Sequence, residues 1–329
     1  MIASTIAPSC GTVRPLRLPA QTLKLVAVLS VLPWAAPVAG QSLPRDSLTE
    51  VVAYVLPPRF SLRGAAVSDA GRVLYWSDSA AVVVAQDLRA IEMVCPRRLT
   101  RPIAAAFVSG DSAVEIVDAG GGAVLRRRGD PLGDCQQILS LRPAGELVSA
   151  ARTVAGWVLG AVATSGVGSV VAVDTLGGTL WSVSPDTGQD GAWDPRFSHL
   201  SAAATGVVIS ALHWPFHWLW LAADGRVVAR TNAGSMGGAL SDAERWFGLP
   251  VIALGASLVQ TIANPGSDQR RLVVYRRDGS LVRVVGLNTA MGLMASSPDG
   301  RLAVAARRTD ALEIVVYRWV GPSPERGGP

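Results

Sequence analysis

A strand pattern that returns at intervals of 40 to 51 residues limits the folds open to this chain. Short apolar runs come in groups of four, separated by turns rich in Gly, Pro and Asp, as expected of β-strands joined by tight turns. The second run of each group begins near Arg72, Ser112, Trp157, Val207, Leu258 and Arg301. Four-stranded units at this spacing are typical of propeller blades. We therefore expect an all-β chain that forms a single six-bladed β-propeller of four-stranded antiparallel blades.

The composition agrees with this architecture. Hydrophobic residues make up 49% of the chain and charged residues 17%, which excludes a disordered chain and predicts a large core. Runs such as Val82–Val84 and Ile314–Val316 lack the strict alternation of a half-exposed sheet. Blades stacked around an axis cover both faces of each sheet, so continuous apolar runs are expected in them. A β-sandwich and two separate all-β domains remain as alternatives.

The last repeat predicts how the propeller closes. Ala290–Trp319 contains three strand candidates, with a tight turn at Pro298–Gly300, and lacks a fourth. An isolated strand candidate, Ser47–Leu56, precedes the first repeat. We expect this segment to supply the missing strand, because an uncovered sheet edge promotes aggregation. The predicted boundaries are then 47–320 for the propeller and 321–329 for a disordered tail.

The first forty residues have the order of an export signal. Three positive residues, Arg14, Arg17 and Lys24, precede an apolar run at Leu25–Leu32, and small residues follow as a cleavage site. The apolar run is short for a membrane span. We expect residues 1–40 to be a signal peptide and the mature protein to be periplasmic or extracellular, with no integral membrane segment left. An uncleaved anchor is the alternative.

Charge excludes several classes of function. Removing the signal peptide lowers the formal net charge from +5 to +2, because that segment holds three positive residues and no negative ones. So small a charge does not fit a protein that binds nucleic acid. Lys24 is the only lysine, so the mature chain offers none for a Schiff base or a Walker-type phosphate loop. We expect no cofactor.

One segment resembles the blade motif of known families. Ser297–Ala305, with the sequence Ser-Pro-Asp-Gly-Arg-Leu-Ala-Val-Ala, looks like the motif of bacterial TolB-like and WD40-like propellers. The layout of six repeats behind an export signal is similar to that of NHL-type six-bladed β-propellers. The layout covers roughly residues 47–319, and only the last repeat carries the motif well. These families include ligand binders, scaffolds and some lactonases, so the resemblance implies a fold more than an activity.

Two cysteines remain after the expected cleavage. Cys95 and Cys135 lie 40 residues apart, close to the length of one repeat. In an oxidising compartment such a pair can form a disulfide. The spacing suggests that the two residues occupy similar positions in adjacent repeats. The alternative to a disulfide is two buried free thiols.

The candidate binding residues lie around repeat four. His213–Trp220 is the densest aromatic stretch, and either blade packing or a surface that binds sugars or peptides explains it. Alternate loops of a propeller share a face, which places the links before and after repeat four beside its inner turn. We expect a recognition surface there, formed by Trp193, Asp194, His213, Trp214, His217, Arg245 and Trp246. The alternative is that these tryptophans cover blade edges.

No catalytic residue or metal ligand is predicted. Pro215 lies between His213 and His217 and indicates a hairpin, so the two imidazoles are not expected to converge on a metal. No G-x-S-x-G elbow supports a hydrolase. We expect an exported, non-enzymatic binding or scaffolding protein with an unknown protein or glycan ligand. The alternatives are a propeller hydrolase or lactonase, marked by a ring of carboxylates at the central channel, and a structural component of the cell envelope.

Overall fold

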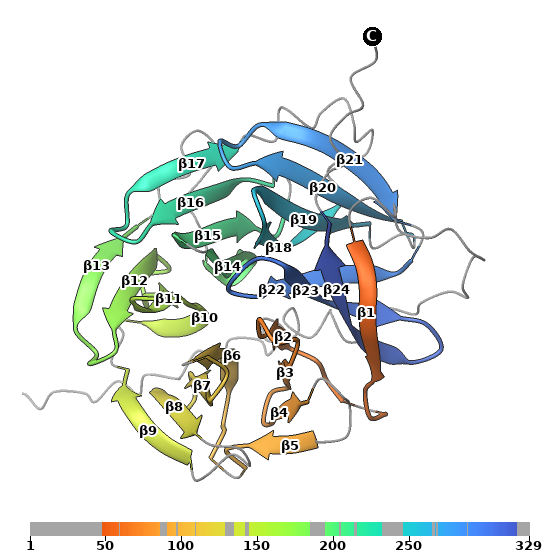
Figure 1. Cartoon of the computed structure of the whole chain (residues 1–329). Helices are drawn as coiled ribbons and strands as arrows, with labels where there is room; N and C mark the ends of the chain where they lie inside the picture. Colours follow the sequence, from red (N-terminus) through yellow and green to blue (C-terminus); the bar gives the residue numbers. More distant parts are fainter. Residues whose placement is uncertain are drawn as a thin grey trace, which may run out of the picture. The chain divides into compact units, whose positions relative to one another are not determined.

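The computed structural model describes residues 48–320 except 59, 86–90, 97, 109, 129–134, 142–144, 185–194, 204, 214–215, 232–245, 265–266, 268 and 288. All of the described residues belong to one compact unit, Ala35–Pro329. They form six four-stranded antiparallel sheets and one short 3-10 helix, η2 (Pro195–Phe197). The expected all-β fold with six blades is confirmed (Figure 1).

The first three blades follow one another in chain order. Blade one contains β2 (Gly64–Val67), β3 (Val73–Trp76), β4 (Ala81–Val84) and β5 (Ile91–Val94). Blade two contains β6 (Pro102–Val108), β7 (Ala113–Asp118), β8 (Ala123–Arg128) and β9 (Cys135–Ser140). Blade three contains β10 (Glu146–Arg152), β11 (Gly156–Val162), β12 (Gly168–Asp174) and β13 (Thr179–Val183).

The other three blades complete the propeller. Blade four contains β14 (Ser198–Ala203), β15 (Gly206–Ala211), β16 (Trp218–Ala222) and β17 (Val227–Thr231). Blade five contains β18 (Phe247–Leu254), β19 (Ser257–Ala263), β20 (Arg270–Arg276) and β21 (Leu281–Leu287). Blade six contains β22 (Met291–Ser296), β23 (Leu302–Arg308), β24 (Leu312–Trp319) and β1 (Leu48–Val55). The first strand of each repeat is innermost and contacts the corresponding strands of both neighbouring blades.

Blade six is built from both ends of the described chain. β1 lies antiparallel beside β24 as the fourth strand, with Leu48 opposite Trp319. The predicted closure of the propeller by Ser47–Leu56 is therefore confirmed (Figure 1). Arg307 on β23 strengthens this joint, because its guanidinium donates to Glu313 at 2.7 Å and to Glu50 on β1 at 2.5 Å.

Apolar cores lie between neighbouring blades. Each of the six blade junctions contains its own cluster of buried residues from the two facing sheets. Between blades four and five, the rings of Trp218 and Tyr275 meet edge to face with centroids 5.6 Å apart. Both faces of a blade are thus covered by apolar side chains, which explains the continuous apolar runs in the sequence.

The innermost strands β6, β10, β18 and β22 carry β-bulges, and at β18 and β22 the preceding blade accepts a hydrogen bond from a backbone N–H beside the bulge. The pairing of β18 with β19 shifts between Gly248 and Val251, and that of β22 with β23 shifts just after Leu293. The N–H of Val251 donates to Ser210 Oγ at 3.2 Å, and the N–H of Leu293 donates to Thr261 Oγ1 at 3.2 Å. Because a buried N–H without an acceptor is costly, these hydroxyls join blade four to five and blade five to six.

The outermost strands run head to tail along the rim (Figure 1). Three junctions are joined by a side chain of one outermost strand that donates to a carbonyl in the turn leading into the next. These bonds run from Tyr54 Oη to Ala85 (3.1 Å), from Trp181 Nε1 to Ala223 (2.7 Å) and from Thr231 Oγ1 to Gly279 (3.1 Å). Each bond fastens two blades at their outer edges.

Bulges also shape the free edges of the outermost strands. Strands β9, β13, β17 and β21 each show a register shift against their inner neighbour. In β17 the shift falls beside Val227 and Val228, and both side chains are exposed. A bulge twists a strand edge and interrupts its hydrogen-bonding row, which opposes pairing with a strand of another chain.

A buried carboxylate joins blades two and three. Glu115 on β7 is 1% exposed and accepts hydrogen bonds from Arg126 on the neighbouring strand β8. Its other oxygen accepts from Arg152 Nε at 2.8 Å and from Trp157 Nε1 at 2.9 Å, both in blade three. The negative charge is therefore compensated by two guanidinium groups and one indole.

The two cysteines of the propeller form a disulfide, with Cα atoms 5.2 Å apart. The expectation that they occupy similar positions in adjacent repeats is wrong. Cys95 directly follows β5, whereas Cys135 begins β9. They meet because the outermost strands run head to tail, so the end of one strand reaches the start of the next (Figure 1).

Two predicted segments lie outside the described residues. These are the signal peptide, residues 1–40, and the disordered tail, residues 321–329. Among the residues that the structure describes, no helix has the length and hydropathy required to span a membrane.

Candidate functional site

Three chain segments meet at one end of blade four. The first is η2, which leads into β14, the second links β15 to β16, and the third leads into β18. The N–H of Leu212 donates to the carbonyl of Phe197 at 2.7 Å, and the N–H of Gly248 donates to the carbonyl of Leu212 at 2.7 Å. An isolated bridge pairs His213 with Phe247. The segments that the sequence placed on one face are thus joined through their backbones.

An exposed aromatic and basic cluster lies on these segments. The rings of Phe197 and His213 are tilted at 52° with centroids 5.6 Å apart, and Phe197 is 41% exposed. The guanidinium carbon of Arg196 lies 6.0 Å from the centre of the Phe197 ring. All three side chains are exposed. We call Arg196, Phe197 and His213 the blade-four surface.

The remaining described aromatic residues of this region are buried or half-buried. Phe216, Trp218 and Trp220 belong to the core between blades four and five, as blade packing predicts. His217 is half-buried and its Nε2 atom is shielded from solvent. Of the predicted recognition residues that the structure describes, only His213 is exposed.

Trp246 does not lie on the surface where the sequence placed it. Its side chain is 3% exposed and packs in the core between blades four and five. The guanidinium of Arg271 lies 4.8 Å from the ring centre. A large ring at the entry to an innermost strand gains more contact by filling the wedge between blades than by facing solvent. The other predicted residues, Trp193, Asp194, Trp214 and Arg245, lie outside the described residues.

His199 lies beneath this surface, on the innermost strand β14. Burial lowers the pKa of its imidazole to about 4, although a hydrogen bond with the backbone of Gly248 opposes the shift. The side chain is therefore neutral at pH 7. Its Nε2 atom is buried and has no hydrogen-bond partner among the described residues.

Two carboxylates meet at the other end of the propeller, where blades six and one join. The N–H of Asp299 donates to Asp69 Oδ1 at 2.9 Å. Burial and the neighbouring Asp299 raise the pKa of Asp69, whereas hydrogen bonds from Ser297 and Arg301 outweigh burial and lower that of Asp299. Among the described residues, no group of three or more His, Cys, Asp and Glu side chains is arranged to hold a metal ion.

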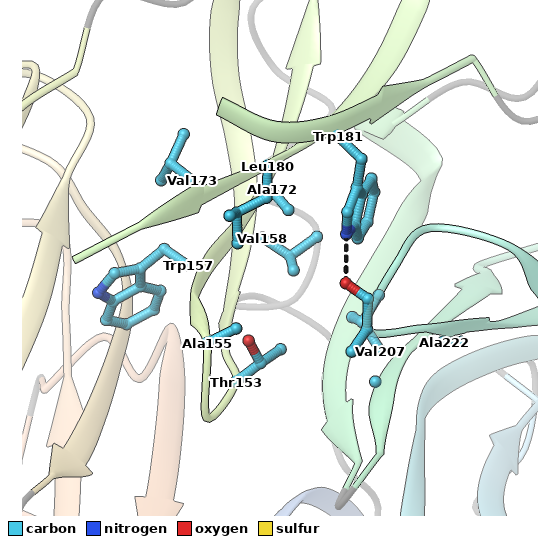
Figure 2. A pocket seen from close by; sticks show the side chains of 12 residues that line it. Thr153, Ala155, Trp157, Val158, Ala172, Val173, Leu180, Trp181, Val207 and Ala222 are labelled. Atoms are coloured by element: carbon cyan, nitrogen blue, oxygen red, sulfur yellow. Dashed lines mark hydrogen bonds between the residues drawn. The ribbon is translucent and has the colours of Figure 1, made fainter. Parts of the chain in front are cut away.

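A crevice lies between blades three and four (Figure 2). Trp157 and Trp181 line it together with small and aliphatic side chains, and Trp181 donates to the carbonyl of Ala223 at its edge. Its enclosed space accommodates about one water molecule. The crevice is too small for an organic ligand.

The innermost strands carry few charged groups. On β2, β6, β10, β14, β18 and β22, Glu146 is the single carboxylate, and it accepts a hydrogen bond from Arg101 at 2.6 Å. The described innermost strands therefore provide no ring of carboxylates around the axis.

Sequence reasoning missed Phe197 as a surface residue. The available signal was its place directly before a strand, in the long link before repeat four where the sequence placed binding residues.

Sequence reasoning also missed the turn of blade one. In Ser68–Arg72 the N–H of Gly71 donates to the carbonyl of Ser68 at 3.0 Å, and Gly300 bonds Ser297 in the same way at 2.9 Å. Blade one thus carries a version of the turn that sequence reasoning assigned to the last repeat alone.

Comparison with known proteins extends the description of the fold. No family model matches the chain, and no curated protein matches it. A chain in the crystal structure of a mitotic checkpoint complex is similar, with a TM-score of 0.53 at 13% identity, over 88% of this chain and 98% of that one.

Two further solved structures are similar at low identity. The WD40 domain of Pan2 from Neurospora crassa has a TM-score of 0.51 at 9% identity, over 87% of this chain and 98% of that one. The β-propeller domain of Cps50 (Swd1) from Myceliophteria thermophila has a TM-score of 0.50 at 12% identity, over 78% and 83%. At these identities the similarity shows the propeller fold alone.

Proposed function

We propose that this protein is an exported, non-enzymatic binding or scaffolding module that recognises a protein or glycan at the blade-four surface. The observation that carries the proposal is the exposed pair Phe197 and His213, held on segments that are bonded to one another. Aromatic rings exposed on a rigid scaffold stack on sugars and anchor peptides. Arg196 beside them adds a donor for hydrogen bonds with polar groups of a ligand.

The composition of the described innermost strands supports a binding role over catalysis at the axis. An enzyme acting at the axis requires acidic or amide groups that converge there, and the described innermost strands offer Glu146, already paired with Arg101. The disulfide between Cys95 and Cys135 supports the exported location, because such bonds persist in oxidising compartments. Amino-terminal sequencing of the exported protein tests the location, and we expect a start near Gln41 or Ser42.

Binding is tested with labelled mature protein on an array of bacterial envelope glycans and an array of short peptides. The double variant Phe197→Ala, His213→Ala should weaken any interaction found by about 30-fold, the effect of removing an aromatic hot spot. The control Leu176→Ala removes a side chain that is 89% exposed in the turn between β12 and β13, at the opposite end of the propeller. Equal binding by the parent and the double variant, or no binding on either array, contradicts the proposal.

A further inference from the structure

The junction between blades four and five holds a half-buried histidine whose Nε2 atom is shielded from solvent. His199 lies on β14, and the backbone of Gly248 on β18 hydrogen-bonds its imidazole. On the same junction, Ser210 accepts from the N–H of Val251 at 3.2 Å. His199 on β14 and Ser210 on β15 lie opposite each other in the sheet, and both join blade four to the innermost strand β18 of blade five.

Protonation of His199 places a positive charge in this junction. The Nε2 atom is buried without a hydrogen-bond partner among the described residues, so the added proton has no acceptor there. Packed strands β15 and β18 carry no charged residue, and β10 carries Glu146 and Arg152. Each of these two is engaged in an ion pair, with Arg101 and Glu115 respectively. Among the residues that the structure describes in this region, the other titratable or charged groups are His213, His217, Arg196 and Arg271, none of which is an anion.

The same junction holds the segments that carry the blade-four surface. The N–H of Gly248 donates to the carbonyl of Leu212, and His213 pairs with Phe247. Separation of β18 from β14 would therefore break the bonds that hold the inner turn of blade four.

We propose that protonation of His199 in mildly acidic solution opens the junction between blades four and five and loosens the segments that carry the blade-four surface. A role of this opening in regulating ligand binding rests on the proposed function. The opening itself does not depend on any ligand.

Hydrogen exchange measured by mass spectrometry on the intact mature protein tests the opening. With a pKa of about 4 in the closed state and the ordinary value in the open state, the opening equilibrium should rise about 30-fold between pH 7.5 and pH 5. Protection factors, which correct for the intrinsic pH dependence of exchange, should fall by that ratio in peptides from β14 and β18. Peptides from β2 and β3 in blade one should keep their protection.

Two variants separate His199 from the other histidines. His199→Gln keeps a donor for Gly248 without a titratable group, and it should abolish the change in protection. His213→Gln should retain the change. The proposal is overturned if the parent protein shows equal protection of β14 and β18 at both pH values, or if His199→Gln responds as the parent does. The parent measurement decides alone if His199→Gln does not fold, and neither readout involves the ligand arrays.

Discussion

The indole of Trp181 in blade three lies over Gly225 in blade four and donates to the neighbouring carbonyl of Ala223 at 2.7 Å. A Cβ at position 225 would lie 2.8 Å from this ring, and the backbone of Gly225 has a φ of +82°. The absence of a side chain in this turn thus permits the rim contact between the two blades.

Gly225→Ala should destabilise the protein more than Gly166→Ala. Gly166 has a similar φ of +84° with nothing within 4 Å of its would-be Cβ, so its substitution reports backbone strain alone, about 1 kcal/mol. Gly225→Ala adds the clash with Trp181, for a further 1–3 kcal/mol or so. Chemical denaturation measures both free energies of unfolding. Equal losses for the two variants would show that the Trp181 contact is unimportant.

Glu115→Gln should cost about 3 kcal/mol of unfolding free energy, because it leaves Arg126 and Arg152 without their buried anion. Glu146→Gln is the matched control, since Glu146 is an exposed partner of Arg101, and its loss should cost less than about 1 kcal/mol. Urea denaturation of the two variants provides the comparison. A small loss for Glu115→Gln would mean that the network is not a major contributor to stability.

The hydroxyls of Ser210 and Thr261, which accept hydrogen bonds from the bulged strands, should each contribute to the free energy of unfolding. Ser210→Ala and Thr261→Val remove the acceptors for the N–H groups of Val251 and Leu293, at a cost of about 1–3 kcal/mol each. Ser182→Ala, at an exposed position on β13, should leave stability within about 0.5 kcal/mol of the parent. Thermal denaturation followed by calorimetry compares Ser210→Ala and Thr261→Val with the control Ser182→Ala. An unchanged melting temperature for both Ser210→Ala and Thr261→Val would refute the role of the hydroxyls.

Deleting residues 47–56 should destabilise the protein by several kcal/mol. The deletion removes β1, exposes the edge of β24 and takes away two buried side chains, Leu48 (3% exposed) and Leu56 (4% exposed). Val55→Ser is a control within the same strand, because Val55 is 66% exposed. The melting temperature is the readout, and an unchanged value for the deletion would contradict closure by β1.

Peptide mapping without reduction should recover Cys95 and Cys135 as one linked pair in exported protein. The double variant Cys95→Ser, Cys135→Ser should lose about 4 kcal/mol, the loop-entropy value for a bridge of this span. Recovery of both residues as free thiols would rule the bridge out.

The repeats were predictable because each blade repeats its turns and its apolar strands. The start of β18 was not predictable from the sequence. The apolar pattern predicts that this strand starts at Val251, whereas it begins at Phe247. Pro250 concealed the start, yet it lies in the bulge, where a missing N–H costs no ladder bond. The burial of Trp246 and the partners of Glu115 depend on contacts between blades, which no spacing along a single chain encodes.

The pairing of β1 with β24 has a consequence for synthesis. β1 is made before the other strands of the propeller, and its partner is made last. Until the final strand is available, the first strand has no native neighbour and blade six cannot exist. A chain interrupted anywhere before Leu312 therefore exposes an unpaired edge, which makes truncated products targets for proteases and chaperones.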